Sequence, residues 1–301
     1  MSSNILPMPV AAAIINGVVP IRDMAAGSIP AESSENRRAR VRAAVREATL
    51  VQAQPASDML WLAPDNFDHS SDYPPLRTPF PFMWFEWQIP DEIDWNNYRS
   101  FFAIVEEHDP ARHGSDEPHP AETFVSLGVT GGFLRGDEVR LLAGVLICNI
   151  TEGGQMLGVI ESPDGRSNFL DGIGAFANDD DACQMLTWLK PAVLAVGLMN
   201  CKNVHTEERS TGNVFNRKKR KRSPKLDYHV IVLPAPAGGG EDAGGHWDVQ
   251  RHKVRGHFKT YTADKPLMGR HVGTYWFARH LRGDAERGRI IADYKLKGDG
   301  M

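Results

Sequence analysis

The stretch MWFEWQI, residues 83–89, gives the clearest indication of a β-sheet, because bulky apolar side chains recur in it at every second position. Met83, Phe85, Trp87 and Ile89 would share one face of an extended chain, and this period of two predicts a β-strand. Later in the chain, short β-like runs of residues, separated by Gly-rich or Pro-rich turns, predict further strands. These runs cover residues 123–129, 138–150, 155–160, 228–233, 273–277 and 289–296.

Three segments favour helices instead. Residues 36–54 have valines on one side and arginines on the other, and residues 94–107 follow an Asp cap with a Phe, Ile and Val face. Residues 179–199 open on three aspartates, which suit the positive end of a helix dipole, although Pro191 should bend or interrupt this helix. Strands mixed with a few helices, without a regular βαβ alternation, predict the α+β class.

The chain has 301 residues and a formal net charge of −4, but the charge is divided unevenly along it. Residues 1–200 hold 13 Lys and Arg against 27 Asp and Glu, whereas residues 201–301 hold 21 against 11. A basic segment of this kind indicates contact with a nucleic acid or another polyanion. The alternative is that the acidic and basic parts pack together and neutralise each other.

These patterns predict three parts. Residues 1–75 are rich in Pro, Ser and Ala around the short helix, and we expect a flexible, weakly ordered arm there. Residues 76–200 are expected to form an acidic body of strands and helices. Residues 201–301 are expected to form a basic, β-rich module, or the end of one continuous domain that begins at residue 76.

The most informative segment is QRHKVRGHFKTY, residues 250–261, which contains no acidic residue. As a strand it would have one polar, mostly basic face, and Gly256 would allow a bulge in it. Cations spaced along a strand can follow a phosphate backbone, whereas the alternative is a solvated outer face. The expected face consists of Arg251, Lys253, Arg255, His257, Lys259 and Tyr261.

A second group of cations, RKKRKR at residues 217–222, is a block of like charge typical of nucleic-acid-binding tails. We expect a mobile loop that contacts phosphates, with a solubilising loop as the alternative. The predicted nucleic-acid contacts are therefore Arg217, Lys218, Lys219, Arg220, Lys221, Arg222, Arg251, Lys253, Arg255, Lys259 and Arg282.

The same segment holds the groups that RNA cleavage without a metal requires. His257 would act as a base or an acid, with His280 or His271 as the second proton carrier. Lys259 and Arg255 would stabilise the phosphorane. The alternative for each histidine is a structural or surface role. The predicted catalytic set is His257, Lys259, Tyr261 and His280.

No metal and no cofactor are expected. Residues 108–119 contain His, Asp and Glu without an ordered ligand spacing, and we interpret them as a solvated acidic loop. The dinucleotide, phosphate-loop and serine-hydrolase motifs are absent from the sequence. Three cysteines without paired spacing fit a reducing compartment and core positions. With neither an export signal nor a membrane span expected, the predicted location is the cytoplasm.

Most of residues 80–296 resembles a family of uncharacterised bacterial and phage-associated proteins. The resemblance is carried by LMNCKNVHTEE, RHKVRGHFKTY, PLMGRHVGTYWFARHLRG and IIADYKLK, and MWFEW adds to it. It implies a prokaryotic or phage origin and no particular activity. Its motif positions are Arg255, Gly256, His257, Phe258, Pro266, Gly269, Gly273, Trp276, His280, Arg282 and Gly283.

Three functional hypotheses follow. The first is binding of RNA or single-stranded nucleic acid by residues 201–301, whose aromatic side chains would stack on bases. The second is a metal-independent ribonuclease of toxin type that uses His257. The third is a phage or mobile-element protein without catalysis, whose acidic half binds a protein partner. The aromatic residues concerned are Trp247, Phe258, Tyr261, Tyr275 and Trp276.

Overall fold

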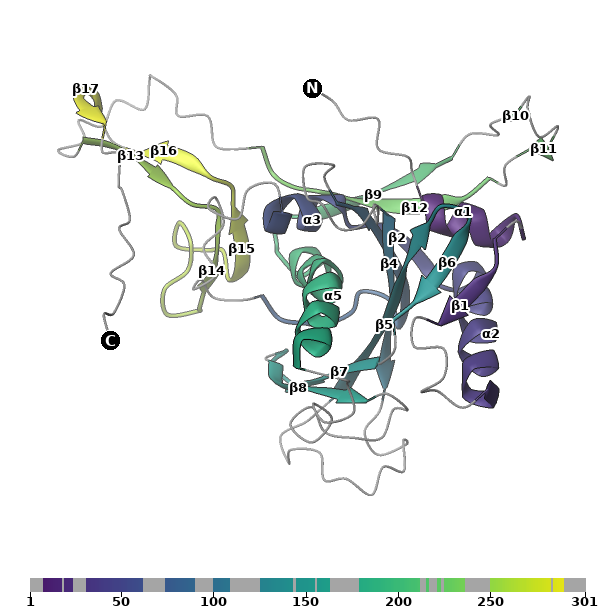
Figure 1. Cartoon of the computed structure of the whole chain (residues 1–301). Coiled ribbons are helices and arrows are strands. Elements are labelled where there is room, and N and C mark those ends of the chain that lie inside the picture. Colours follow the sequence, from purple (N-terminus) through teal and green to yellow (C-terminus); the bar gives the residue numbers. More distant parts are fainter. Residues whose placement is uncertain are drawn as a thin grey trace, which may run out of the picture.

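The structure is a computed structural model, and the statements below concern the residues that it describes. These are residues 8–17, 19–23, 31–61, 74–89, 100–108, 125–142, 145–154, 156–162, 179–211, 215–216, 221–222, 225–235, 250–282 and 284–289. Within them, helices lie on both faces of a large mixed sheet (Figure 1). The predicted α+β class is confirmed.

The central sheet has ten strands in the order β1-β6-β5-β4-β3-β2-β12-β9, with β7 and β8 continuing from β5. The neighbours from β3 to β6 are antiparallel, whereas β2 runs parallel to both β3 and β12. The strands are β1 (Ile21–Asp23), β2 (Thr49–Gln52), β3 (Phe82–Gln88), β4 (Ser100–His108), β5 (Val125–Arg135), β6 (Glu138–Leu141), β7 (Val145–Ile150), β8 (Met156–Ser162), β9 (His205–Ser210) and β12 (Asp227–Val232).

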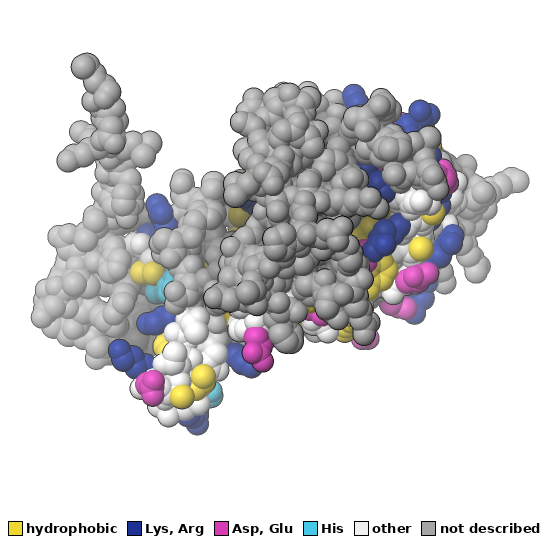
Figure 2. Space-filling model, turned by 90° about the horizontal axis from the view of Figure 1, so that it is seen from below, with side chains coloured by type: hydrophobic (Ala, Val, Ile, Leu, Met, Phe, Trp, Pro, Cys, Tyr) yellow, Lys and Arg dark blue, Asp and Glu magenta, His cyan; other side chains and the backbone are white. Residues whose placement is uncertain are grey.

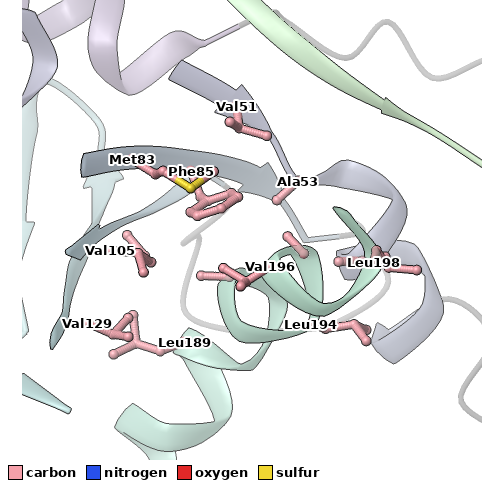
Figure 3. Packing of buried hydrophobic residues seen from close by; sticks show 14 of the residues in the cluster. Val51, Ala53, Met83, Phe85, Val105, Val129, Leu189, Leu194, Val196 and Leu198 are labelled. Carbon is pink, nitrogen blue, oxygen red and sulfur yellow. The ribbon is translucent and has the colours of Figure 1, made fainter. Parts of the chain in front are cut away.

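Four helices cover the two faces of this sheet in the described part of the chain, α1 (Pro9–Ile15), α2 (Ala31–Glu47), α3 (Gln54–Trp61) and α5 (Asp179–Met199). Met83 and Phe85 pack in one cluster with α3 and α5 (Figure 3), whereas Trp84 packs in the other with α1 and α2. β3 is therefore buried on both faces. α5 continues through Pro191. None of the described helices has the length and apolarity that a membrane crossing requires.

The prediction of a helix over residues 94–107 is wrong, because the chain from Ser100 to His108 is strand β4. Phe101 to Val105 are all buried, since helices cover the sheet above and below this strand. A strand buried on both faces has a continuous apolar run, and such a run cannot be distinguished from a buried helix by its periodicity. Residues 90–99 lie outside the described part.

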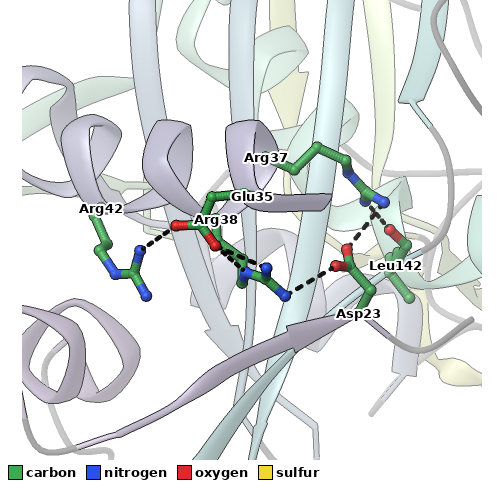
Figure 4. Close-up of polar contacts among 6 residues, drawn as sticks. All are labelled: Asp23, Glu35, Arg37, Arg38, Arg42 and Leu142. Carbon is green, nitrogen blue, oxygen red and sulfur yellow. Dashed lines mark hydrogen bonds and ion pairs between the residues drawn. The ribbon is translucent and has the colours of Figure 1, made fainter. Parts of the chain in front are cut away.

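The prediction of a flexible arm over residues 1–75 does not fit the described part of that segment. The expected helix ends at Glu47, and β2 then enters the middle of the sheet between β3 and β12. Asp23 at the end of β1 also anchors α2 (Figure 4). Its Oδ1 lies 3.1 Å from Arg37 Nη1, and the Arg37 guanidinium donates to the Leu142 carbonyl.

Helix α1 is held by a carboxylate from the central sheet. Its N-cap residue, Met8, makes no side-chain cap, but Glu86 of β3 accepts hydrogen bonds from the backbone N–H groups of Val10 and Ala11 at 2.9 and 2.6 Å. Trp84 Nε1 donates a third hydrogen bond to this carboxylate at 2.8 Å. Glu86 is buried, and its burial raises the pKa of the carboxyl to about 7, although the three hydrogen bonds oppose this shift.

The boundary expected at residue 200 does not divide the sheet, since β9 and β12 belong to it. Beyond β9 and β12, the short strands β10 (Phe215–Asn216) and β11 (Lys221–Arg222) pair in the same register. Ser210 of β9 lies opposite Asp227 of β12. Phe215, five residues after Ser210, lies opposite Arg222, five residues before Asp227. These four strands therefore follow one antiparallel register.

Candidate nucleic-acid interface

The segment expected as one basic strand forms two strands, β13 (Gln250–Val254) and β14 (His257–Tyr261). β14 pairs with β15 (Gly273–Phe277), and β13 pairs with β16 (His280–Arg282) and β17 (Asp284–Arg289). His257 lies opposite Phe277. Val254, which is three residues before His257, lies opposite His280, which is three residues after Phe277. The two pairs leave two residues on each strand between them, so the strands keep one hairpin register. The bulge expected at Gly256 is therefore not found in this pairing, and only the strand itself is interrupted, at Arg255–Gly256.

One face of the β14–β15 hairpin is anchored in the core. Phe258 and Trp276 lie opposite each other, are 2% and 4% exposed, and belong to the cluster that contains α5. The turn after α5 also holds the outer edge of β15. Asn203 Nδ2 donates to the Trp276 carbonyl at 2.6 Å, and the Trp276 N–H donates to Asn203 Oδ1 at 2.9 Å. Backbone N–H of Lys202 donates to Thr274 at 2.9 Å.

The other face of the hairpin carries aromatic rings from both strands beside an exposed cation. The His257 ring is stacked on Phe277 with 5.4 Å between centroids, and Tyr261 meets Tyr275 edge-on at 5.9 Å. The ammonium of Lys259, which lies opposite Tyr275, is 5.1 Å from the centre of the Tyr261 ring. We call these five side chains the ring face. The four rings are partly exposed and Lys259 is exposed.

The expected alternation of faces is therefore observed within β14, where Phe258 is buried between His257 and Lys259. Three groups beside this row were not predicted from the sequence. Phe277 completes the stack on His257, Arg279 is exposed just beyond it, and Lys202 lies at the opposite end. The stem of Lys202 fills the space where a side chain at Gly273 would stand. The alternation in GTYWF, residues 273–277, was the available signal for Phe277.

The predicted proton carriers His257 and His280 lie opposite Phe277 and Val254, in pairs three positions apart along the two strands. No hydrogen bond between the two imidazoles is found among the described residues. Each imidazole instead donates from Nδ1 to a carbonyl two residues earlier, Arg255 at 2.9 Å and Ala278 at 3.1 Å. These hydrogen bonds orient the two rings and use Nδ1 of each, so Nε2 is the ring nitrogen that they do not involve.

The remaining predicted contacts are distributed more widely. Lys253 and Arg255 are exposed, close to the interruption of the ribbon. Arg251 and Arg282 lie in β13 and β16, with side chains outside the described part. Lys221 and Arg222 lie in strand β11 rather than in the expected loop. Arg217, Lys218, Lys219, Arg220, Trp247 and most of the acidic loop at 108–119 lie outside the described residues.

The described side chains at this end of the molecule include more cations than carboxylates. In the region where Figure 1 places β14 and β15, Figure 2 shows Lys, Arg and His side chains and fewer Asp and Glu side chains among apolar ones. Ion pairs of β9 and β12, such as Arg209–Glu207 and Lys225–Asp227, are local. Within the described part of the chain, no ion pair involves Lys259. Its charge is therefore accessible to an external anion.

The described cysteines are unsuited to nucleophilic chemistry. Cys148 and Cys201 are buried, as expected for core residues, and burial raises the pKa of each thiol to about 12. Since the thiolate is the reactive form, neither side chain is a nucleophile near neutral pH.

We predict that Asn203→Ala loosens the hairpin, because both backbone groups of Trp276 then lose their partner. The expected loss of stability is about 1–3 kcal/mol, with faster amide hydrogen exchange confined to β15. Lys202→Ala keeps the backbone donor to Thr274 and removes only the side-chain stem beside Gly273, so a smaller loss than in Asn203→Ala is expected. Unchanged exchange of the Trp276 amide in Asn203→Ala would contradict this role.

Comparison with protein-family models, curated proteins and solved structures gave no match for this chain. The resemblance to bacterial and phage-associated proteins therefore remains an expectation from the sequence motifs.

Proposed function

We propose that the protein binds single-stranded nucleic acid, RNA above all, on the ring face of the β14–β15 hairpin. One observation carries the proposal: rings from both strands lie partly exposed in one row, with the Lys259 ammonium beside Tyr261 and Tyr275. Aromatic side chains stack on unpaired bases of any sequence, and nearby cations contact the phosphates. A duplex hides its base faces, so this arrangement favours a single strand.

The anchoring of the hairpin supports the same proposal. Phe258 and Trp276 are fixed in the core, and Asn203 holds both backbone groups of Trp276. The rings on the outer face are therefore carried by a backbone that does not need to reorganise. A preorganised surface binds more tightly because less conformational freedom is lost on association.

The test is binding of a fluorescently labelled single-stranded RNA, measured by anisotropy in EDTA at several salt concentrations. Tyr275→Ala is expected to weaken binding about 10-fold, whereas Tyr275→Phe retains the ring and the affinity. Lys259→Glu should weaken binding and flatten the salt dependence, since each phosphate contact on a single strand contributes a slope of about 0.7.

The control for charge is Arg46→Glu, an exposed residue of α2 on the opposite side of the central sheet. This variant should bind RNA like the wild type. Equal loss in Arg46→Glu and Lys259→Glu would show nonspecific attraction and contradict the ring face. Cleavage of the RNA that is lost in His257→Ala would replace the proposal with a ribonuclease, and absence of binding at low salt would leave a protein partner.

A further inference from the structure

The two strands of the ring face are joined by a tip, residues 262–272, that exposes apolar side chains to solvent. Met268 is 83% exposed and Val272 is 47% exposed, and these are the exposed large hydrophobic residues of the described part of the chain. Scattered surface hydrophobics are common, but here both belong to one tip of eleven residues. The tip continues directly from the strands that carry Tyr261 and Tyr275.

The tip has a defined backbone conformation. Leu267 and His271 exchange backbone hydrogen bonds at 2.8 and 3.0 Å, and Arg270 N–H donates to the Leu267 carbonyl at 3.2 Å. Met268 and Gly269 both have positive φ, 51° and 74°. A left-handed conformation is uncommon for a residue with a side chain, and it places an unbranched thioether at the end of the hairpin.

Exposed cations flank Met268 in the sequence of the tip. Lys265, Arg270 and His271 are exposed, with Asp264 as the acidic residue among them. Arg270 Nε lies 2.9 Å from His271 Nε2, which holds the two side chains together. An apolar side chain between cations matches the end of a duplex, where the face of the last base pair is apolar and the phosphates beside it are anionic.

We infer that the tip is a wedge, in which Met268 packs against the terminal base pair where a single strand on the ring face becomes a duplex. This inference rests on the proposed function and extends it to the substrate class: a single-stranded overhang next to a duplex. Methionine is among the apolar residues that proteins place against base steps, and the two arms of the hairpin direct the strand from the rings to the tip. Lys265 and Arg270 contact the phosphates on either side of the junction.

The test compares one labelled single-stranded RNA with the same strand extended into a stable hairpin duplex, which carries 2-aminopurine in its terminal pair. Wild type should bind the extended RNA about 10-fold more tightly and change the 2-aminopurine fluorescence. Met268→Asn should bind both RNAs equally, with unchanged affinity for the single strand. Asparagine tolerates the left-handed conformation, so misfolding would not explain that result. Met268→Leu retains an apolar side chain and should keep the preference.

The outcomes separate the two proposals. Single-strand binding without a preference for the junction, or a preference that survives in Met268→Asn, would overturn the wedge and leave the ring face intact. Absence of single-strand binding in the wild type would overturn both. Binding to phosphatidylcholine vesicles that is lost in Met268→Asn, without a preference for the junction, would assign the tip to lipid and overturn the wedge.

Discussion

Glu86→Ala is expected to lower the free energy of unfolding by about 3–5 kcal/mol at pH 7. The substitution removes the acceptor of three buried donors, the N–H groups of Val10, Ala11 and the Trp84 indole. A buried donor without a partner costs about 1–3 kcal/mol, and a cavity adds to the loss. Urea denaturation followed by circular dichroism measures this change.

Glu86→Gln is the matched variant. Its amide keeps one oxygen for Ala11 and Trp84, but its NH₂ group faces the N–H of Val10, so we expect a smaller loss than in Glu86→Ala. A Glu86→Ala protein within about 1 kcal/mol of the wild type would show that the carboxylate does not hold α1.

The pH profile of stability gives a second measurement on the same residue. Burial raises the pKa of Glu86 to about 7, above its ordinary value of 4.5, so the folded protein binds a proton that the unfolded chain has released. This stabilising contribution is fully present below pH 4.5 and is lost as the pH rises through about 7. Wild type should lose about 3 kcal/mol across this window, a component that Glu86→Gln lacks.

Gly132→Ala is expected to lower stability by about 2–4 kcal/mol, because the new methyl group has no space between strands β4 and β6. A Cβ atom at this position would lie 2.2 Å from the Arg140 carbonyl oxygen and 2.7 Å from Phe102 Cε1. The Arg140 carbonyl belongs to the backbone of β6, so the clash is relieved only if β6 moves away from β5. The pairing of Gly132 with Leu141 then weakens.

The control lies in the turn of the same hairpin. Gly136 has a φ of 58°, and a Cβ atom there would meet no atom within 4 Å, so Gly136→Ala is expected to lose only about 1 kcal/mol through backbone strain. Thermal or urea unfolding of both variants shows which of the two proteins is less stable. A Gly136→Ala protein less stable than Gly132→Ala would contradict the steric argument.

The proposed interface illustrates what sequence patterns can locate. The period of two in residues 257–261 correctly assigned Phe258 to the core and Lys259 to the surface, because alternation is a property of any extended chain. The same pattern could not pair this strand with residues 273–277. Pairing depends on the turn between the strands, so the stack of His257 on Phe277 is visible only in the folded hairpin.

Local patterns were enough to predict the α+β class, about half of the strands and the helix over residues 179–199, since each depends on local periodicity. Of the strand expected over residues 289–296, all but Arg289 lies outside the described part. The tertiary structure decided the rest. Residues 100–108 became a strand, and Thr49–Gln52 entered the middle of the sheet, because helices cover both faces and bury side chains that local patterns assign differently. Glu86 reaches a helix some 75 residues away, and such long-range contacts leave no local signal in the sequence.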